Sequence, residues 1–274
     1  MNRDYVLGLL AAIATMIPGA LLIALGVPTA PVLIVTVGAA VAALVSLNRR
    51  WYRRVIARID SQATHLRSVV GFSATSGGLP IFWSEHAIAP ETLALIQHMI
   101  LSLNACRVLE LGSGLSTVLL ANHFRRAGEG RVLSYDDDER WAALTKASLE
   151  REGLASIAEV RVAPLTEVEA GGRRAAWYDL SGLDKSERFD LIVVDGPPSW
   201  KGDSLARLPA LYELIPRLAD NGVLVLDDAA RPGERTIAWQ WQRDFPDLHF
   251  RMVEIGRGLF VASRQGAALE LLPN

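Results

Sequence analysis

No charged residue occurs between Asp4 and Arg49, and this stretch constrains the fold more than any other feature of the 274-residue chain. Its first apolar run, Tyr5 to Leu25, has about the twenty residues that a helix needs to cross the hydrocarbon core of a bilayer. The segment GVPTAP (26–31) then marks a turn before a second, shorter run from Val32 to Leu47. The sequence therefore predicts a two-helix transmembrane hairpin over residues 1–48.

Five arginines follow the second run, whereas the predicted turn carries no charge: Arg49, Arg50, Arg53, Arg54 and Arg58. Because positive charge is retained on the cytoplasmic side, everything after Arg49 is expected in the cytoplasm, with a multi-pass anchor in a bacterial-type inner membrane. A cleaved signal peptide is the competing interpretation, although the first run is long for one and a second run follows it. The arginines also suit a solvated helix face that is unrelated to topology.

The rest of the chain divides into two predicted parts. Residues 49–78 read as a basic juxtamembrane helix and a linker, because SATSGGLP (73–80) breaks the helical pattern with a glycine pair and a proline. Residues 79–274 are the predicted folded domain, which opens with a helix at Ala89 to Leu103 carrying Pro90 in its first turn. The formal net charge of -2 gives no electrostatic reason to expect a nucleic-acid partner.

Short apolar runs alternate with helical patterns through this domain. The strand-like runs are CRVLELG, RVLSYD, AEVRVAP, FDLIVVDG and GVLVLDD, and helices are expected at 116–126, 139–152 and 205–218. Continuous apolar strands separated by helices indicate a parallel sheet that is covered on both faces. The final segment, LHFRMVEIGRGLFVASR (248–264), has two strand-like runs joined by GRG. The expected fold class is α/β, a doubly wound and mainly parallel seven-stranded sheet with a C-terminal antiparallel hairpin.

The turn after the first of these strands, LELGSGLST (109–117), is the expected ligand contact, because doubly wound sheets bind ligands at the carboxyl ends of their strands. A dinucleotide fingerprint needs a third glycine where this chain has Thr117. Glu110 would also place negative charge near a pyrophosphate. Both features disfavour a dinucleotide and favour a cation with an amino-acid end.

Glu110-x-Gly112-x-Gly114 resembles motif I of the class I S-adenosylmethionine (SAM)-dependent methyltransferases, and the resemblance extends over roughly Leu79 to Arg264. It implies that SAM is the cofactor. The residues that it assigns to SAM are Glu110, Gly112, Ser113 and Gly114 for the methionine part, Asp136 for the ribose hydroxyls, and Pro164 and Leu165 beside the adenine ring.

Three further side chains near this turn are assigned from the residues themselves. Ser116 is a contact candidate, but we expect it to be the N-cap of the following helix. Asp137 and Asp138 are expected to be solvated or to cap the helix that starts near Glu139.

Three carboxylates follow the fourth and fifth strands and would meet at the same edge of the sheet: Asp195, Asp227 and Asp228. Together they suit Mg²⁺ or Ca²⁺, which would lower the pKa of an acceptor hydroxyl. This resembles the metal-dependent O-methyltransferases related to the catechol and caffeoyl-CoA enzymes, whose ligands are an Asp and an Asp-Asn pair. Alternatively, Asp195 contacts substrate or SAM directly, and Asp227 and Asp228 cap a helix beginning near Arg235.

Two residues are candidate catalytic groups besides Asp195. The metal-dependent enzymes carry a lysine three residues after the first Asp, where this chain has Pro198, so Lys201 is the nearest candidate base. His86 lies in the segment IFWSEHAIAPE (81–91), which by analogy would close over the SAM pocket. Alternatively, His86 packs against Trp83 and has only a structural role.

The sequence thus favours a membrane-anchored SAM-dependent methyltransferase that acts on oxygen in a small-molecule, lipid or glycan acceptor. A membrane-tethered NAD-dependent oxidoreductase and a non-catalytic SAM-fold binding module are the alternatives. Its oligomeric state is not predicted.

Overall fold

The computed structural model describes residues 13, 17, 20–75, 87–199 and 203–272. The chain forms two compact units, Met1–Thr64 and His65–Asn274. The predicted linker at 73–80 lies largely outside the described residues, so the predicted domain boundaries stay predictions.

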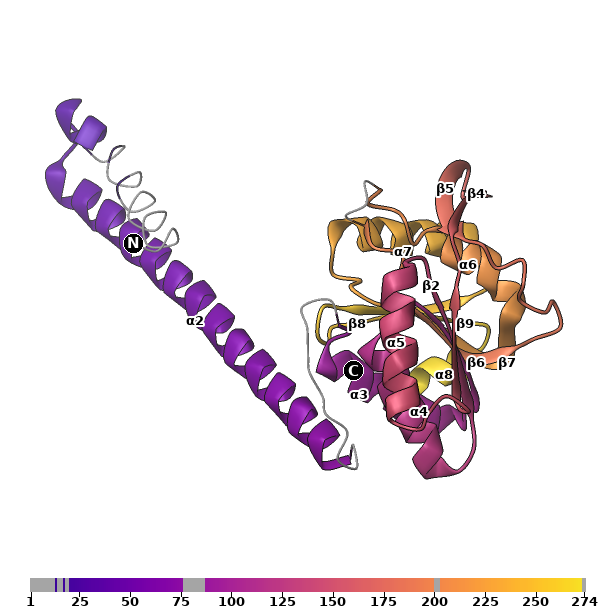
Figure 1. Cartoon of the computed structure of the whole chain (residues 1–274). Coiled ribbons are helices and arrows are strands. Elements are labelled where there is room, and N and C mark those ends of the chain that lie inside the picture. The colour runs from indigo at the N-terminus through magenta and orange to yellow at the C-terminus, as the bar shows by residue number, and fades with distance from the viewer. Residues whose placement is uncertain (1–12, 14–16, 18–19, 76–86, 200–202, 273–274) are drawn as a thin grey trace. The chain divides into compact units, whose positions relative to one another are not determined.

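The N-terminal unit contains most of one long apolar helix, α2 (Thr29–Thr75), drawn in indigo and purple in Figure 1. Among the described residues it is the one helix long and apolar enough to cross a membrane. The predicted second apolar run and the basic segment after it form this single uninterrupted helix. Most of the predicted first run, Tyr5 to Leu25, falls among the residues that are not described.

The described end of that first run is helical and stops at the predicted turn. Gly26 has φ +82° and its N–H donates to the carbonyl of Ile23, while the N–H of Val27 donates to the carbonyl of Leu22. This is the Schellman pattern, in which a left-handed glycine ends a helix and satisfies its last carbonyls. The helical turn preceding Gly26 and the start of α2 at Thr29 are therefore two separate helical segments.

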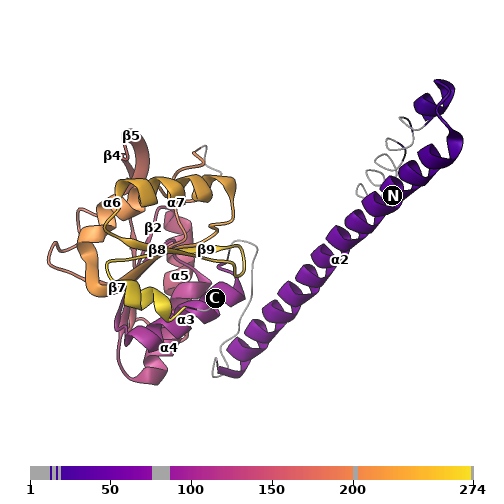
Figure 2. The same ribbon diagram turned by 180° about the vertical axis from the view of Figure 1, so that it is seen from behind.

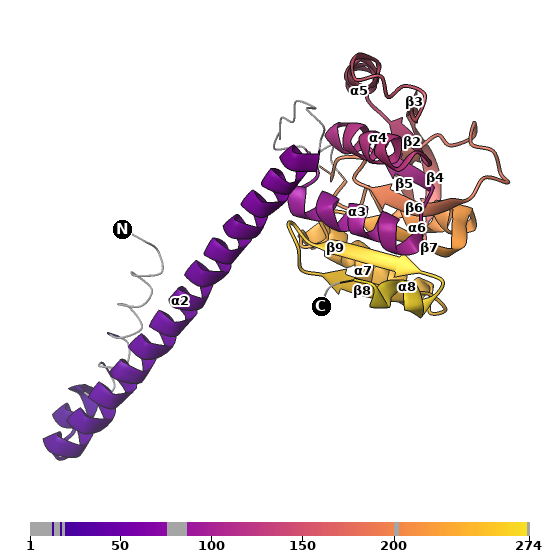
Figure 3. The same cartoon turned by 90° about the horizontal axis from the view of Figure 1, so that it is seen from below.

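The C-terminal unit is built on a seven-stranded sheet in the order β3-β2-β1-β6-β7-β9-β8. The first five are parallel, and β9 pairs antiparallel with both β7 and β8, which gives the predicted C-terminal hairpin; β3 lies at one edge and the β8–β9 hairpin at the other (Figure 3). The strands are β1 (Arg107–Leu111), β2 (Arg131–Asp136), β3 (Ala158–Val162), β6 (Phe189–Val194), β7 (Leu218–Leu226), β8 (His249–Val253) and β9 (Leu259–Ser263).

Helices cover both faces of this sheet (Figures 1 and 2). Successive strand residues point to opposite faces, so Val108 packs with α3, α4 and α5 while Leu109 packs with α6 and α7. The helices are α3 (Pro90–Leu103), α4 (Leu115–Ala127), α5 (Glu139–Arg151), α6 (Pro209–Leu214), α7 (Pro232–Asp244) and α8 (Gly266–Glu270). Two apolar layers therefore fix the carboxyl ends of β1, β2, β6 and β7 relative to one another.

Two elements differ from the prediction. A separate antiparallel hairpin, β4 (Leu165–Ala170) and β5 (Arg173–Tyr178), stands between β3 and β6 where no strands were predicted. The helix predicted over 205–218 is only the short α6, followed by the 3₁₀ turn η2 (Ile215–Arg217), because Pro216 cannot donate the hydrogen bond that would continue it.

Candidate active site

The loop after β1 approaches the end of β6 so closely that only glycine fits at its first position. Gly112 has φ +100°, and a Cβ atom there would lie 3.1 Å from the backbone nitrogen of Gly196. At Gly114 the position of a Cβ is open space. The prediction that glycines here leave room for a ligand agrees with that geometry.

Glu110 lies beneath this loop rather than in the cavity. Its side chain is fully buried, and its Oε2 accepts hydrogen bonds from the hydroxyls of Ser134 (2.8 Å) and Thr117. Burial raises the pKa of this carboxyl, and the hydroxyl donors oppose that shift. Glu110 therefore holds the turn in shape, and its direct contact with SAM stays a prediction.

Thr117 explains why this loop lacks a third glycine. Its hydroxyl donates to Glu110 and accepts the N–H of Gly114 at 3.0 Å, so one side chain joins the strand to the loop. The N-cap of α4 is Gly114, and the predicted N-cap Ser116 is wrong because the helix already begins at Leu115. A threonine at the third helical position thus bonds back to the N–H of the N-cap residue, which is the half of a capping box that needs no N-cap side chain.

Asp136 ends β2 and is held by three donors. Its Oδ2 accepts from the backbone N–H (2.8 Å) and the hydroxyl (2.6 Å) of Ser113, and its Oδ1 accepts from the N–H of Asp138 at 2.9 Å. Burial is the main cause that raises the pKa of Asp136. The predicted cap is confirmed at Asp138, which accepts from the backbone N–H groups of Arg140 and Trp141 at the start of α5.

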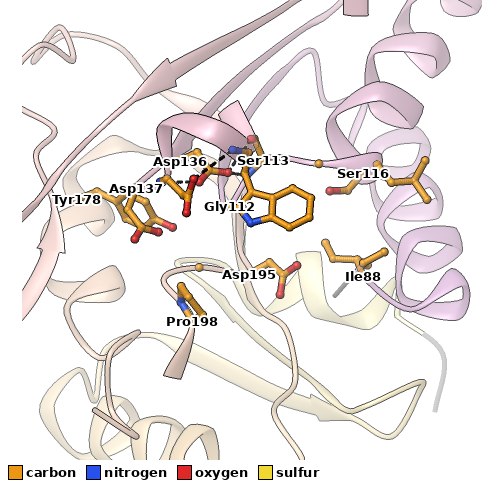
Figure 4. A pocket seen from close by; sticks show the side chains of 15 residues that line it. Ile88, Gly112, Ser113, Ser116, Asp136, Asp137, Tyr178, Asp195 and Pro198 are labelled. Atoms are coloured by element: carbon orange, nitrogen blue, oxygen red, sulfur yellow. Dashed lines mark hydrogen bonds between the residues drawn. The ribbon is translucent and has the colours of Figure 1, made fainter. Parts of the chain in front are cut away.

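These residues border a cavity of about 290 Å³ at the carboxyl edge of the sheet (Figure 4). Four carboxylates line it, and none of its described lining residues is basic. The lining comprises Ala87, Ile88, Gly112, Ser113, Gly114, Leu115, Ser116, Asp136, Asp137, Asp138, Trp141, Tyr178, Asp195, Gly196 and Pro198. An acidic cavity of this kind suits a cation and opposes the pyrophosphate of a dinucleotide.

Two aromatic lining residues were not predicted from the sequence. Trp141 is half exposed on α5 at the cavity, where its indole offers an apolar face. Tyr178 ends the unpredicted hairpin, is buried, and its hydroxyl has no hydrogen-bond partner among the described residues. Burial raises the pKa of Tyr178, so its hydroxyl is a neutral donor facing the cavity.

The two residues that were predicted beside the adenine ring are not among the described lining residues. Pro164 and Leu165 lie at the base of the β4–β5 hairpin, where the carbonyl of Pro164 accepts the N–H of Asp179. His86 and Lys201 are outside the described residues, as is Trp83. Their assigned roles stay predictions, although Ala87 and Ile88, at the end of the segment that was expected over the pocket, do line the cavity.

The three predicted carboxylates do converge. Asp195, Asp227 and Asp228 each place one carboxylate oxygen within 4.8 Å of the other two. Asp227 and Asp228 do not cap α7, since the N-cap is Arg231 and no side chain caps that helix. Convergence at the edge of the sheet is therefore confirmed, and the capping interpretation is wrong.

Burial governs the proton affinity of this triad. It raises the pKa of Asp195 well above its ordinary value, and the neighbouring charge of Asp227 adds to the effect. Burial and the charge of Asp228 raise the pKa of Asp227 to about 6. Asp195 is the member of the triad that reaches the cavity, so it combines access to ligand with a carboxylate that holds protons tightly.

Comparisons with known proteins agree with this geometry. Residues 109–229 match the family model of a methyltransferase domain. The O-methyltransferase TomG from Streptomyces achromogenes, solved with SAM, is similar in fold, with 18% identity, a TM-score of 0.50, and coverage of 75% of this chain and 99% of that one. An O-methyltransferase from Bacillus cereus, solved with S-adenosylhomocysteine (SAH), has 20% identity and a TM-score of 0.47, and the match covers 73% of this chain and 90% of that one. No curated protein matches the sequence.

The sheet order and the loop after β1 define the class I Rossmann-like fold. By the family-model match, residues 109–229 of the C-terminal unit form a methyltransferase domain.

Proposed function

We propose that this chain is a membrane-anchored methyltransferase that transfers the methyl group of SAM to a hydroxyl oxygen of a small-molecule, lipid or glycan acceptor. The observation that carries the proposal is the acidic cavity. Four carboxylates line it, and none of its described lining residues is basic. SAM supplies a methyl group on a positively charged sulfonium, which needs no phosphate-binding donors.

The described residues divide the work of holding SAM. Asp136 would accept from the ribose hydroxyls with the lone pairs that Ser113 and Asp138 leave free. Gly112 and Gly114 would border the methionine part, and Trp141 would lie against the flat adenine ring. Each role follows from the position of the residue in the cavity wall.

Asp195 is the proposed general base for the acceptor hydroxyl. It comes from the end of β6, lies in the cavity, and its raised pKa brings its proton affinity nearer to neutral pH than that of an ordinary aspartate. The carboxylate would accept the hydroxyl proton as the new carbon–oxygen bond forms. A divalent cation at Asp195, Asp227 and Asp228 is the sequence-based alternative for activating the hydroxyl.

The anchor is supported by the surface of α2. Large apolar side chains on the helix are more than half exposed, among them Leu33, Ile34, Val35, Val37 and Val41. A soluble helix would bury such a face, whereas lipid covers it without cost. With the helical turn that ends at Gly26, α2 would form the second arm of a hairpin in the inner membrane, with the catalytic unit in the cytoplasm.

The cofactor is tested on the purified, detergent-solubilised full chain. SAH should raise its melting temperature and NAD should not, because only a ligand of the folded state stabilises it. Stabilisation by NAD alone would favour the oxidoreductase alternative. Methylated products are then compared between cells that express the wild-type chain and cells that express Asp195→Asn. If the chain binds SAH but the wild type adds no methylated product, the non-catalytic module is favoured.

The anchor is tested separately in cells. The chain should stay in the membrane fraction after carbonate extraction, and Val37→Asp with Val41→Asp should release it, because each aspartate costs about 2.5–3.5 kcal/mol at the centre of a spanning helix. A periplasmic reporter fused after Arg54 should be inactive. An active reporter would reverse the proposed topology.

A further inference from the structure

Three arginines surround the carboxylate triad at the ends of β6 and β7. We call the six residues the carboxylate–arginine cluster: Asp195, Asp227, Asp228, Arg207, Arg231 and Arg257. The arginines come from three different loops, before α6, before α7 and between β8 and β9. Their convergence on one acidic site is a property of the fold and is not visible in the sequence.

Both oxygens of Asp228 lie at ion-pair distance from arginines, although its Oδ1 has no hydrogen-bond partner among the described residues. The Nε of Arg257 lies 2.6 Å from its Oδ1, and a terminal nitrogen of Arg231 lies 2.8 Å from its Oδ2. A terminal nitrogen of Arg207 is 3.5 Å from the same Oδ2. Because the side chain of Asp228 is 2% exposed, these charges act in a site with little water to screen them.

Arg207 is buried among the strand ends. Its guanidinium donates to the backbone carbonyls of Asp195, Pro197 and Asp227, and lies 3.3 Å from the Oδ1 of Asp195. One fixed positive charge therefore ties the loops after β6 and β7 together and touches two of the three carboxylates. This guanidinium cannot lose its proton at physiological pH.

Arg257 connects the cluster to the cavity wall. Its guanidinium donates to the carbonyl of Ala87, a lining residue, at 2.9 Å and also lies 3.8 Å from the Oδ2 of Asp227. Its side chain is about one-third exposed, so it reaches from the buried carboxylates to the surface. The position of the wall near Ala87 thus depends on the same charges that neutralise Asp228.

Arginines already offset most of the negative charge of this region. Three guanidinium groups stand against the carboxylates of Asp195, Asp227 and Asp228, and the nearby buried Glu234 adds one further acid. Mg²⁺ and Ca²⁺ bind through several oxygen ligands, and their affinity depends on the charge that these ligands carry. Both oxygens of Asp228 lie within 2.8 Å of a guanidinium nitrogen, and the adjacent guanidinium groups repel an added cation. The Oδ1 of Asp228 and both oxygens of Asp227 have no hydrogen-bond partner among the described residues, so the guanidinium charge is what opposes a metal ion here.

We infer that Arg207, Arg231 and Arg257 supply the positive charge that a divalent cation supplies in metal-dependent relatives, and that this methyltransferase binds SAM and acts without a metal. The inference rests on the proposed function for the activity, but the ion-pair geometry supports the metal-binding part independently. Arg207 and Arg257 are positioning residues, since they act through Asp195, Asp228 and the cavity wall.

The direct test is Mn²⁺ binding to the detergent-solubilised full chain, followed by the electron paramagnetic resonance signal of free Mn²⁺. We expect the wild-type protein to leave this signal unchanged, and SAH affinity to be equal in Mg²⁺ and in EDTA. Saturable Mn²⁺ binding that Asp227→Asn abolishes would overturn the inference. Loss of SAH binding under all conditions would instead refute the proposed function, so the two failures are distinguishable.

Arginine variants test the cause. The double variant Arg231→Gln with Arg257→Gln should gain Mn²⁺ affinity by about ten-fold or more, because two unit charges next to the ion are removed. The charge-conserving pair Arg231→Lys and Arg257→Lys should bind no better than the wild type. Arg243→Gln, which removes an exposed arginine of α7 paired with Asp244, is the matched control.

If the folded double variant gains no Mn²⁺ affinity, the guanidinium groups are not what excludes the ion and the inference fails. If the double variant does not fold, the single variant Arg231→Gln, which leaves Arg257 and its contact with Ala87 in place, is titrated instead. A gain in Mn²⁺ affinity then supports the inference and no gain counts against it.

Discussion

Asp227 predicts an unusual pH dependence of stability. Its side chain is fully buried, and neither carboxylate oxygen has a hydrogen-bond partner among the described residues. Burial, with the adjacent charge of Asp228, raises its pKa from 3.8 to about 6. The ionised carboxylate is therefore destabilising in the folded state, and Asp227→Asn removes it with almost no change in shape.

The magnitude follows from this shift. The pKa of Asp227 is higher in the folded state than in the unfolded state, so the protonated carboxyl favours folding. Its full contribution to stability is present below about pH 4 and is lost as pH rises through about 6. At 1.36 kcal/mol per pKa unit, the loss is about 3 kcal/mol at pH 7.5. An amide at this position does not titrate, so the Asp227→Asn variant should be more stable than the wild type by up to about 3 kcal/mol at pH 7.5. That corresponds to roughly 6–12 °C in melting temperature.

The assay is urea unfolding of the full chain, followed by tryptophan fluorescence between pH 4.5 and 7.5. The advantage of Asp227→Asn should shrink as pH falls, while Asp220→Asn, at an exposed position of β7, should match the wild type throughout. An Asp227→Asn protein that is no more stable than the wild type at pH 7.5 would refute the reasoning. It would mean that a bound cation or another group compensates the charge of Asp227.

Three further predictions concern the cavity and the core. Asp136→Ala should raise the SAH dissociation constant by about 10–100-fold in calorimetry, because a buried charged acceptor is lost, and unchanged affinity would contradict the ribose assignment. Gly112→Ala should cost about 1–3 kcal/mol in urea unfolding, since φ is +100° and Gly196 is too close for a Cβ; wild-type stability would show that the loop can move aside. Trp241→Ala should cost about 3–5 kcal/mol because the indole is fully buried, whereas Trp239→Ala, on the exposed side of the same helix, should change stability by less than about 0.5 kcal/mol; equal effects would contradict the assigned packing.

The seven strands of the main sheet were predictable because buried parallel strands are continuous apolar runs. The β4–β5 hairpin was missed because LTEVEA and RRAAWY (165–170 and 173–178) carry several charges and show neither a continuous apolar run nor strict alternation. One signal was present in the sequence, the Gly171-Gly172 pair, because Gly-Gly is a common two-residue hairpin turn; both glycines have positive φ in the structure. Recognising it would have placed Tyr178 near the cavity.

The site was predictable where its residues follow the carboxyl ends of recognisable strands, as do the carboxylates Asp195, Asp227 and Asp228. Gly112, Ser113 and Asp136 follow directly from strand ends and their loops, and the structure places all three at the cavity. The direction of the Glu110 side chain depends on Ser134, which lies on the neighbouring strand, so sequence spacing alone could not show that it points beneath the loop. The arginines of the carboxylate–arginine cluster were missed for the same reason.

The cluster also explains how a fold can keep a buried carboxylate that has no hydrogen-bond donor among the described residues. Arg207 holds the backbone of both strand ends, so the positions of Asp195 and Asp227 are fixed by carbonyl hydrogen bonds as well as by their own charges. Asp228 takes most of the positive charge, which leaves Asp227 close to Asp195 without such a donor. Burial raises the pKa of Asp195 at the cavity, and the repulsion from Asp227 adds to this effect. A neutral residue at position 227 would thus stabilise the protein and weaken its proposed base, and a stability gain in Asp227→Asn should come with slower methyl transfer near neutral pH.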